Sequence, residues 1–156
     1  MPNSLEEVLK FTTFTGELLN RIALNYNNNR QSYRRMKILI CEDNKLALKT
    51  MSVVLEREGF KSDTAENGND AITLLKQEVY DMVVVDIHLP YHSGLELVRF
   101  LRSDLQQTTP VIIVTAFSDS QIQRQASELG IDGYIVKPFN PSDLVEKIRS
   151  ILKTNS

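Results

Sequence analysis

The stretch MVVVDIH at residues 82–88 places four apolar residues directly before a carboxylate, Asp86. The run lacks polar alternation and is rich in β-branched residues, which is typical of a strand covered on both faces. Two other runs have the same character, ILIC at 38–41 and VIIV at 111–114. Strands of this kind occur in parallel sheets between two layers of helices, so the sequence predicts an α/β fold.

Weaker strands and segments of helical period occupy the rest of the chain. A short apolar run at 134–136 predicts a fourth strand, and the mostly polar segment 61–65 predicts an exposed edge strand. Periodicity predicts helices near 46–58, 68–77, 95–102, 119–129 and 142–153. Ser142 is the expected N-cap of the last helix, and Gly94 is an expected turn glycine. Five strand–helix units in succession imply a doubly wound parallel sheet with right-handed crossovers.

The first 36 residues differ from the rest in charge and in pattern. They hold five Lys or Arg and three Asp or Glu, whereas the whole chain holds 18 and 20. Apolar residues at helical spacing predict an amphipathic helical extension over 1–26, which weak helix formers at 12–16 could divide in two. The Asn- and Arg-rich segment 27–36 predicts a polar linker before a domain at 37–156. The apolar stripe of the extension could pack on its own domain or on another chain.

Composition excludes several classes of protein. A chain of 156 residues with 42% apolar and 24% charged residues fits one globular domain with an appendage. The single cysteine, Cys41, cannot form an internal disulfide and is expected to be a small buried side chain. No apolar run approaches the ~20 residues that span a bilayer. Glu6 and Glu7 stand where an export signal carries positive charge, so we expect a cytoplasmic protein.

Polar residues stand at the ends of the predicted strands. They are Glu42 and Asp43 after the first strand, Asp86 after the third, Thr115 after the fourth and Lys137 after the last. In an open parallel sheet these ends share one edge, where ligands bind at the switch point of the strand order. Three neighbouring carboxylates repel one another unless a cation is bound. Mg²⁺, a hard ion that prefers oxygen ligands, is the expected cofactor.

This combination of groups suits phosphoryl transfer. Asp86 is the expected nucleophile, since a carboxylate is already ionised and can form an aspartyl phosphate without a base. Lys137 would pair with one phosphoryl oxygen, and the Thr115 hydroxyl would donate to another. The chain contains neither GxxxxGK[ST] nor GxGxxG, so we do not expect it to bind ATP as the phosphoryl donor.

Residues 37–153 resemble a receiver domain of the two-component response-regulator family. The residues that carry the resemblance are the acidic pair at 42–43, Asp86 in VDIHLP, Thr115 in VTA, and GYIVKPF at 133–139. The resemblance implies a flavodoxin-like (βα)5 sheet with strand order 2-1-3-4-5. It also implies a cis peptide bond between Lys137 and Pro138.

The resemblance implies a donor and a set of metal ligands. Receiver domains accept a phosphoryl group from a phosphohistidine on a sensor kinase or a phosphotransfer protein. On this sequence Asp86 would be the acceptor, and Asp43, Asp86 and the backbone carbonyl of His88 would bind Mg²⁺ directly. Glu42, where family members often have Asp, would act mostly through water.

The resemblance also implies a switch. Thr115 and Tyr134 are similar to the switch pair of the family, which remodels the face formed by the fourth helix, fifth strand and last helix of the domain. Since the last predicted helix ends shortly before Ser156, we expect a stand-alone signalling phosphoacceptor without an output domain, and not an enzyme. Its signal would pass to a protein partner, through a homodimer formed by the N-terminal helix or the switch face, or along a phosphorelay. We expect no direct binding to nucleic acid or membrane.

Two other functions fit part of the pattern. A phosphohydrolase of the haloacid dehalogenase type also forms an aspartyl phosphate, but its Asp-x-Asp motif would require an acid at His88. A pseudo-receiver binds partners without phosphorylation, and would have a gap among the acidic pair, Asp86 or Lys137. The sequence has no such gap.

Overall fold

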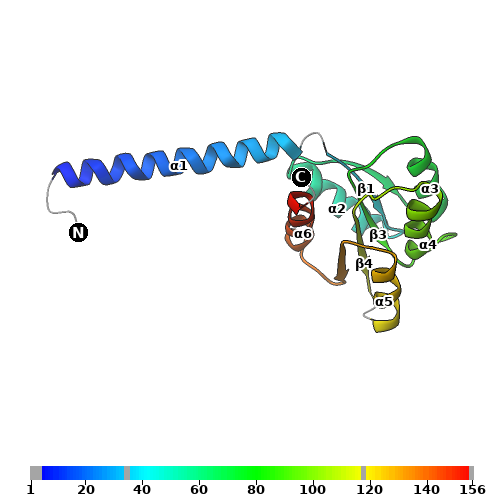
Figure 1. The fold of residues 1–156 in the computed structure, drawn as a ribbon. Helices are drawn as coiled ribbons and strands as arrows, with labels where there is room; N and C mark the ends of the chain where they lie inside the picture. The colour runs from blue at the N-terminus through cyan, green and yellow to red at the C-terminus, as the bar shows by residue number, and fades with distance from the viewer. Residues whose placement is uncertain (1–4, 34–35, 117–118, 155–156) are drawn as a thin grey trace.

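Five parallel strands form a single sheet in the order β2-β1-β3-β4-β5. The computed structural model describes residues 5–33, 36–116 and 119–154. Its elements are α1 (Leu5–Tyr33), β1 (Lys37–Cys41), α2 (Lys45–Arg57), β2 (Lys61–Ala65), α3 (Gly68–Gln77), β3 (Met82–Asp86), α4 (Gly94–Arg99), η1 (Phe100–Asp104), β4 (Val111–Thr115), α5 (Ser120–Glu128), β5 (Gly133–Val136) and α6 (Pro141–Thr154) (Figure 1). The predicted flavodoxin-like fold and its strand order are confirmed.

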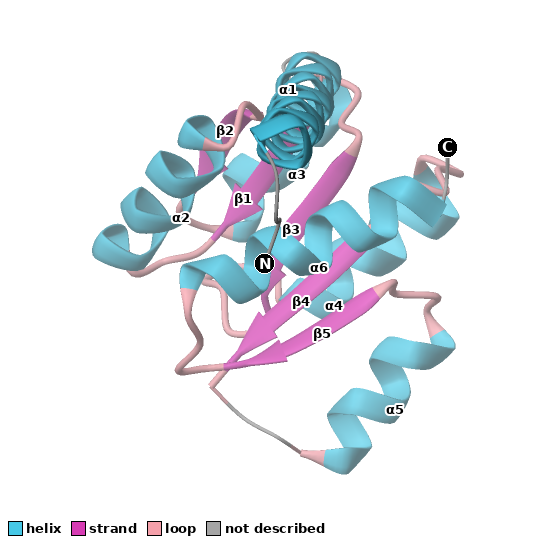
Figure 2. Ribbon diagram, turned by 90° about the vertical axis from the view of Figure 1, so that its left-hand side faces the viewer, coloured by secondary structure: helices cyan, strands magenta, loops and turns pink. Residues whose placement is uncertain are grey.

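Each central strand supplies side chains to two apolar layers. In β3, Val83 and Val85 pack with residues of α3, α4 and α5, whereas Met82 and Val84 pack with residues of α2 and α6. Figure 2 shows α6 crossing one face of the sheet, with α3 and α4 on the other. All residues of β3 and β4 are buried, which explains why these runs lack polar alternation.

The N-terminal helix differs from the prediction. Helix α1 is continuous over 29 residues, without a break at 12–16, and it includes residues 27–33, where the sequence predicts a linker. Relative to Ala, a Gly lowers helix stability by only about 1 kcal/mol, and Thr and Asn lower it by less. These residues therefore weaken a helix without ending it. Residues 1–4 and 34–35 lie outside the described ranges, so the division into extension, linker and domain stays a prediction.

Helix α1 extends away from the sheet and its helices (Figure 1). Neither it nor any other helix in the described ranges combines the length and the apolar character needed to cross a membrane.

Two helix boundaries differ from those predicted. Helix α6 begins at Pro141, not after Ser142, since proline suits the first helical position, where an amide hydrogen has no partner. The backbone N–H of Asn140 donates to Asp143 Oδ2 at 3.3 Å, which supports this start. The helix predicted near 95–102 is α4 followed by the π-helical turn η1.

A polar cluster joins β1, β2 and the segment before β3. The Tyr80 hydroxyl donates to Asp63 Oδ2 at 2.7 Å, and Lys37 Nζ lies 2.8 Å from the same oxygen. Burial raises the pKa of Asp63, but the hydrogen bonds from Lys37 and Tyr80 outweigh burial and hold that pKa below its usual value. The edge strand β2 is therefore held by side chains as well as by its pairing with β1.

Replacing Tyr80 by Phe should lower the free energy of unfolding by about 1 kcal/mol at neutral pH, because a hydrogen bond to a charged group is lost while the ring stays buried. The effect is modest since Asp63 is partly exposed and screened by water. The pKa of Asp63 is lower in the folded state than in the unfolded state. The charge of Asp63 therefore stabilises the fold fully above the unfolded-state pKa, and this stabilisation is lost as the pH falls through the folded-state pKa.

Urea unfolding should therefore show a clear difference between Tyr80→Phe and the parent at neutral pH, and a smaller one near about pH 3. Tyr91, whose side chain is exposed, offers a control, since Tyr91→Phe should leave the free energy of unfolding unchanged at both pH values. A difference of equal size at both pH values would contradict the role of the Asp63 charge.

Candidate functional site

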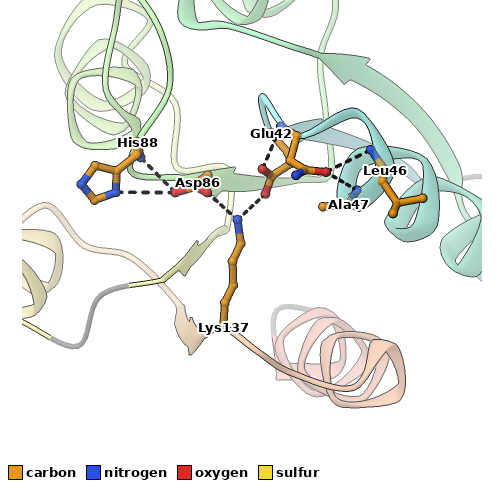
Figure 3. Close-up of polar contacts among 7 residues, drawn as sticks. Glu42, Leu46, Ala47, Asp86, His88 and Lys137 are labelled. Atoms are coloured by element: carbon orange, nitrogen blue, oxygen red, sulfur yellow. Dashed lines mark hydrogen bonds and ion pairs between the residues drawn. The ribbon is translucent and has the colours of Figure 1, made fainter.

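Residues far apart in the sequence meet where β1, β3 and β5 end. Lys137 Nζ lies 2.5 Å from Glu42 Oε2 and 2.5 Å from Asp86 Oδ2 (Figure 3). Glu42 follows β1, Asp86 ends β3 and Lys137 follows β5, so the crossovers of the fold bring the three groups to one edge of the sheet. The peptide bond between Lys137 and Pro138 is cis, as the resemblance implies.

The same edge holds a cluster of carboxylates. Glu42, Asp43 and Asp86 each offer an oxygen atom, and these oxygens all lie within 4.8 Å of one another. Glu42 and Asp86 are only 1% and 6% exposed, whereas Asp43 is exposed to solvent. Lys137 contacts two of these three acids. The surplus negative charge and the oxygen donors fit a hard divalent cation such as Mg²⁺.

Backbone amides orient the two buried carboxylates. The N–H of His88 donates to Asp86 Oδ1 at 2.9 Å, and the N–H of Asn44 donates to Glu42 Oε1 at 3.1 Å. The side chain of Asn44 also caps α2 by accepting from the N–H groups of Leu46 and Ala47. Asn44 was not among the predicted site residues, although an Asn directly before a helical segment is a common N-cap signal.

The ammonium group of Lys137 is held in its charged form. Partial burial lowers its pKa, but hydrogen bonds to Asp86 and Glu42 outweigh burial and raise that pKa above its usual value. The backbone N–H of Lys137 also donates to the carbonyl of Thr115 at 2.8 Å. One residue thus connects the buried acids to the end of β4.

Thr115 and Tyr134 lie on neighbouring strands. Thr115 is fully buried at the end of β4, and Tyr134 is half-buried on β5, level with Ile113 in the strand register. Burial, with a smaller effect from the Asp119 charge, raises the pKa of Tyr134, so its phenol stays neutral near pH 7. The two predicted switch residues are therefore on adjacent strands at the β5 edge of the sheet.

Gly94 supports the site in a way that the sequence analysis did not predict. A methyl group at Gly94 would lie 2.5 Å from the backbone oxygen of Asp86 and 3.0 Å from the Cα of Ile87. The predicted role as a turn glycine is wrong, because the positive φ of this turn, 71°, belongs to Tyr91. Gly94 is the first residue of α4, and its small size allows that helix to pack directly against the backbone of Asp86.

Replacing Gly94 by Ala should lower the free energy of unfolding by about 1–3 kcal/mol, because the added methyl group has no space and the clashing atoms are backbone. Denaturant unfolding measures this loss. Gly16→Ala is the matched control, since a methyl group at Gly16 meets no atom within 4 Å. Equal unfolding midpoints for Gly94→Ala and the parent would contradict the close packing of α4 against Asp86.

The chain matches a known protein family. Residues 38–149 match the family model of the response regulator receiver domain. The response regulator ArlR of Staphylococcus aureus is 38% identical over 117 residues, which cover 75% of this chain and 52% of ArlR. The chain thus spans about half the length of the curated relatives it matches.

Solved structures agree with the family match. The receiver domain of the Francisella response regulator 1452 superposes with a TM-score of 0.73 at 28% identity, covering 78% of this chain and 100% of that one. A CheY-like receiver domain protein from Methanospirillum hungatei JF-1 gives a TM-score of 0.73 at 30% identity, covering 76% and 94%. The fold, the cluster at the strand ends and the family match together show that this chain belongs to the response regulator receiver domain family.

Proposed function

We propose that this chain accepts a phosphoryl group on Asp86 from a phosphohistidine of a sensor kinase or phosphotransfer protein. The observation that carries the proposal is the contact of one ammonium group, Lys137, with both Asp86 and Glu42, beside the exposed acid Asp43. In this proposal Asp86 is the nucleophile, Lys137 is the cation for phosphoryl oxygens, and the neighbouring acids are metal ligands, all at the same edge of the sheet.

In the proposed reaction an oxygen of Asp86 attacks phosphorus, and the bond between phosphorus and the donor imidazole nitrogen breaks. The contacts of Asp86 prepare it for this step, since the His88 amide binds Oδ1 and Lys137 binds Oδ2, which fixes the plane of the carboxylate. Lys137 would then bond a phosphoryl oxygen, and the Thr115 hydroxyl would donate to another. No general base is required, because Asp86 carries no proton to remove.

Mg²⁺ would be bound directly by Asp43, Asp86 and the backbone carbonyl of His88, with Glu42 acting mostly through water. When bound, the ion supplies positive charge that neutralises phosphoryl oxygens in the transition state. Both carboxylate oxygens of Glu42 already accept hydrogen bonds, one from Lys137 and one from the Asn44 amide.

Phosphorylation would then change the face formed by α5, β5 and α6 through Thr115 and Tyr134, and that face would signal to a protein partner. The support for this step is the burial of Thr115 at the end of β4 and the half-buried position of Tyr134 on the neighbouring strand. In this role the chain is a signalling module and does not turn over a substrate. The absence of an output domain, a phosphorelay role and the absence of nucleic-acid binding stay predictions.

Acetyl phosphate with Mg²⁺ should add one phosphoryl group to the full chain, as measured by intact mass. Acetyl phosphate replaces the protein donor, so the result depends on this chain alone. An unchanged mass would favour a pseudo-receiver and overturn the proposal. Continuous release of phosphate from a phosphomonoester would instead favour a phosphohydrolase.

A further inference from the structure

Helix α1 carries an apolar stripe that the described part of the chain leaves uncovered. Phe14, Leu18, Leu19 and Ile22 are 64%, 47%, 65% and 56% exposed. With ~3.6 residues per turn, these four side chains lie within one sector of about 140° around the helix. Figure 1 shows α1 extending away from the sheet and from the helices that cover it.

A helix with this sequence needs a packing partner to be stable. It contains Gly16 and many Asn and Thr residues, all weaker helix formers than Ala or Leu. Helices in water draw most of their stability from the burial of an amphipathic face and not from propensity. Large apolar side chains grouped on one exposed face are also rare in monomers and mark surfaces that bind other molecules.

We propose that α1 pairs in antiparallel orientation with α1 of a second copy of this chain. The charge distribution of the helix identifies the partner. Residues 5–19 contain three Glu and one Lys, whereas residues 20–33 contain two Arg and no acid. The two halves of the helix therefore carry net charges of -2 and +2. Antiparallel pairing aligns each negative half with the positive half of the other copy, whereas parallel pairing aligns like charges.

The polar face of α1 argues against a membrane as the partner. Helices that lie on membrane surfaces carry mostly Lys and Arg on their polar face. In α1 the exposed polar residues away from the stripe include Glu17, Asn20 and Asn27. A self-complementary helix satisfies both the apolar stripe and the charge gradient without a second kind of molecule.

Charges placed on the stripe test the pairing in the full chain. Leu18→Glu together with Ile22→Glu should raise the dissociation constant of the dimer at least about 100-fold, because two apolar contacts per copy are replaced by charges. Thr13→Glu together with Asn27→Glu adds the same charge, one in each half of the helix, away from the stripe, and should change the constant less than about threefold. Sedimentation analysis of both variants and the parent measures these constants.

A parent chain that stays monomeric at all accessible concentrations would overturn the pairing, as would two variants that dimerise equally well. Labelling of all three proteins by acetyl phosphate reports on the receiver domain. Loss of pairing with normal labelling thus separates this inference from the proposed function. Equal labelling also shows that the stripe variants remain folded in the domain.

Spin labels test the orientation. Asn20→Cys and Asn27→Cys supply one label site each on the same outer face of the helix, and Cys41 stays unlabelled because it is 1% exposed and burial raises the pKa of its thiol. In a centred antiparallel pair the two copies of residue 20 are offset by less than about 10 Å along the axis, whereas those of residue 27 are offset by about 25 Å. Pulsed dipolar spectroscopy should therefore find a longer distance for residue 27 than for residue 20. Equal distances for the two sites would show parallel pairing and overturn the proposed orientation.

Discussion

After incubation with acetyl phosphate and Mg²⁺, the Asp86→Asn protein should keep its original mass, whereas the parent should gain one phosphoryl group. The neutral amide oxygen of Asn is a poor nucleophile, so the loss should be complete within the detection limit of intact-mass measurement. Asn at this position can still accept the hydrogen bond from the His88 amide and fill the same volume. The fold should therefore survive the substitution.

Asp104→Asn is the matched control for this experiment. Asp104 lies exposed in η1, and its conversion to an amide removes one carboxylate from the surface without touching the site. It should be labelled as fully as the parent. Undiminished labelling of Asp86→Asn would refute the assignment of Asp86, and the acceptor would have to be sought among the neighbouring acids.

Lys137→Met should reduce the rate of labelling by acetyl phosphate about 100-fold, because the variant lacks the cation that pairs with a phosphoryl oxygen. Methionine keeps an unbranched apolar stem in place of the lysine stem. The substitution also leaves Glu42 and Asp86, both buried, without their ammonium partner. The free energy of unfolding without metal should therefore fall by about 3 kcal/mol.

Mg²⁺ should raise the melting temperature of Lys137→Met more than that of the parent. In the variant, Glu42 and Asp86 lack the lysine, and an added cation relieves the repulsion between them. Time courses of intact mass and thermal unfolding with and without Mg²⁺ measure the two effects. Lys147→Met, an exposed position on α6, is the control and should match the parent in both. A labelling rate for Lys137→Met equal to that of the parent would contradict the proposed role of the lysine.

The strands and the edge of the sheet that holds the acids could be predicted from the sequence because their signals are local. The run before Asp86 is apolar on both faces of the strand, and the polar residue that follows marks the strand end. Once the strands are known, parallel pairing brings Asp86 and Lys137 to the same edge, however far apart they are in the chain.

Other contacts could not be predicted, because they depend on how loops fold back. The approach of Gly94 to the Asp86 backbone requires the intervening loop to reverse direction at Tyr91. Arg102 is a similar case, since its guanidinium donates to the carbonyls of Gln107, Thr109 and Gly130, the last of which is 28 positions away. Neither contact has a periodicity or a motif that marks it in the sequence.

The shortness of β5 has a consequence for signalling. This strand has four residues and pairs on one side only, whereas β3, which ends in Asp86, is buried along its whole length between two neighbours. A displacement of β5 disturbs one ladder of hydrogen bonds, while a displacement of β3 would disturb two and open the core on both faces. The proposed acceptor Asp86 thus lies on a strand held by two neighbours, whereas the proposed switch residue Tyr134 lies on an edge strand that can shift with the loss of fewer contacts.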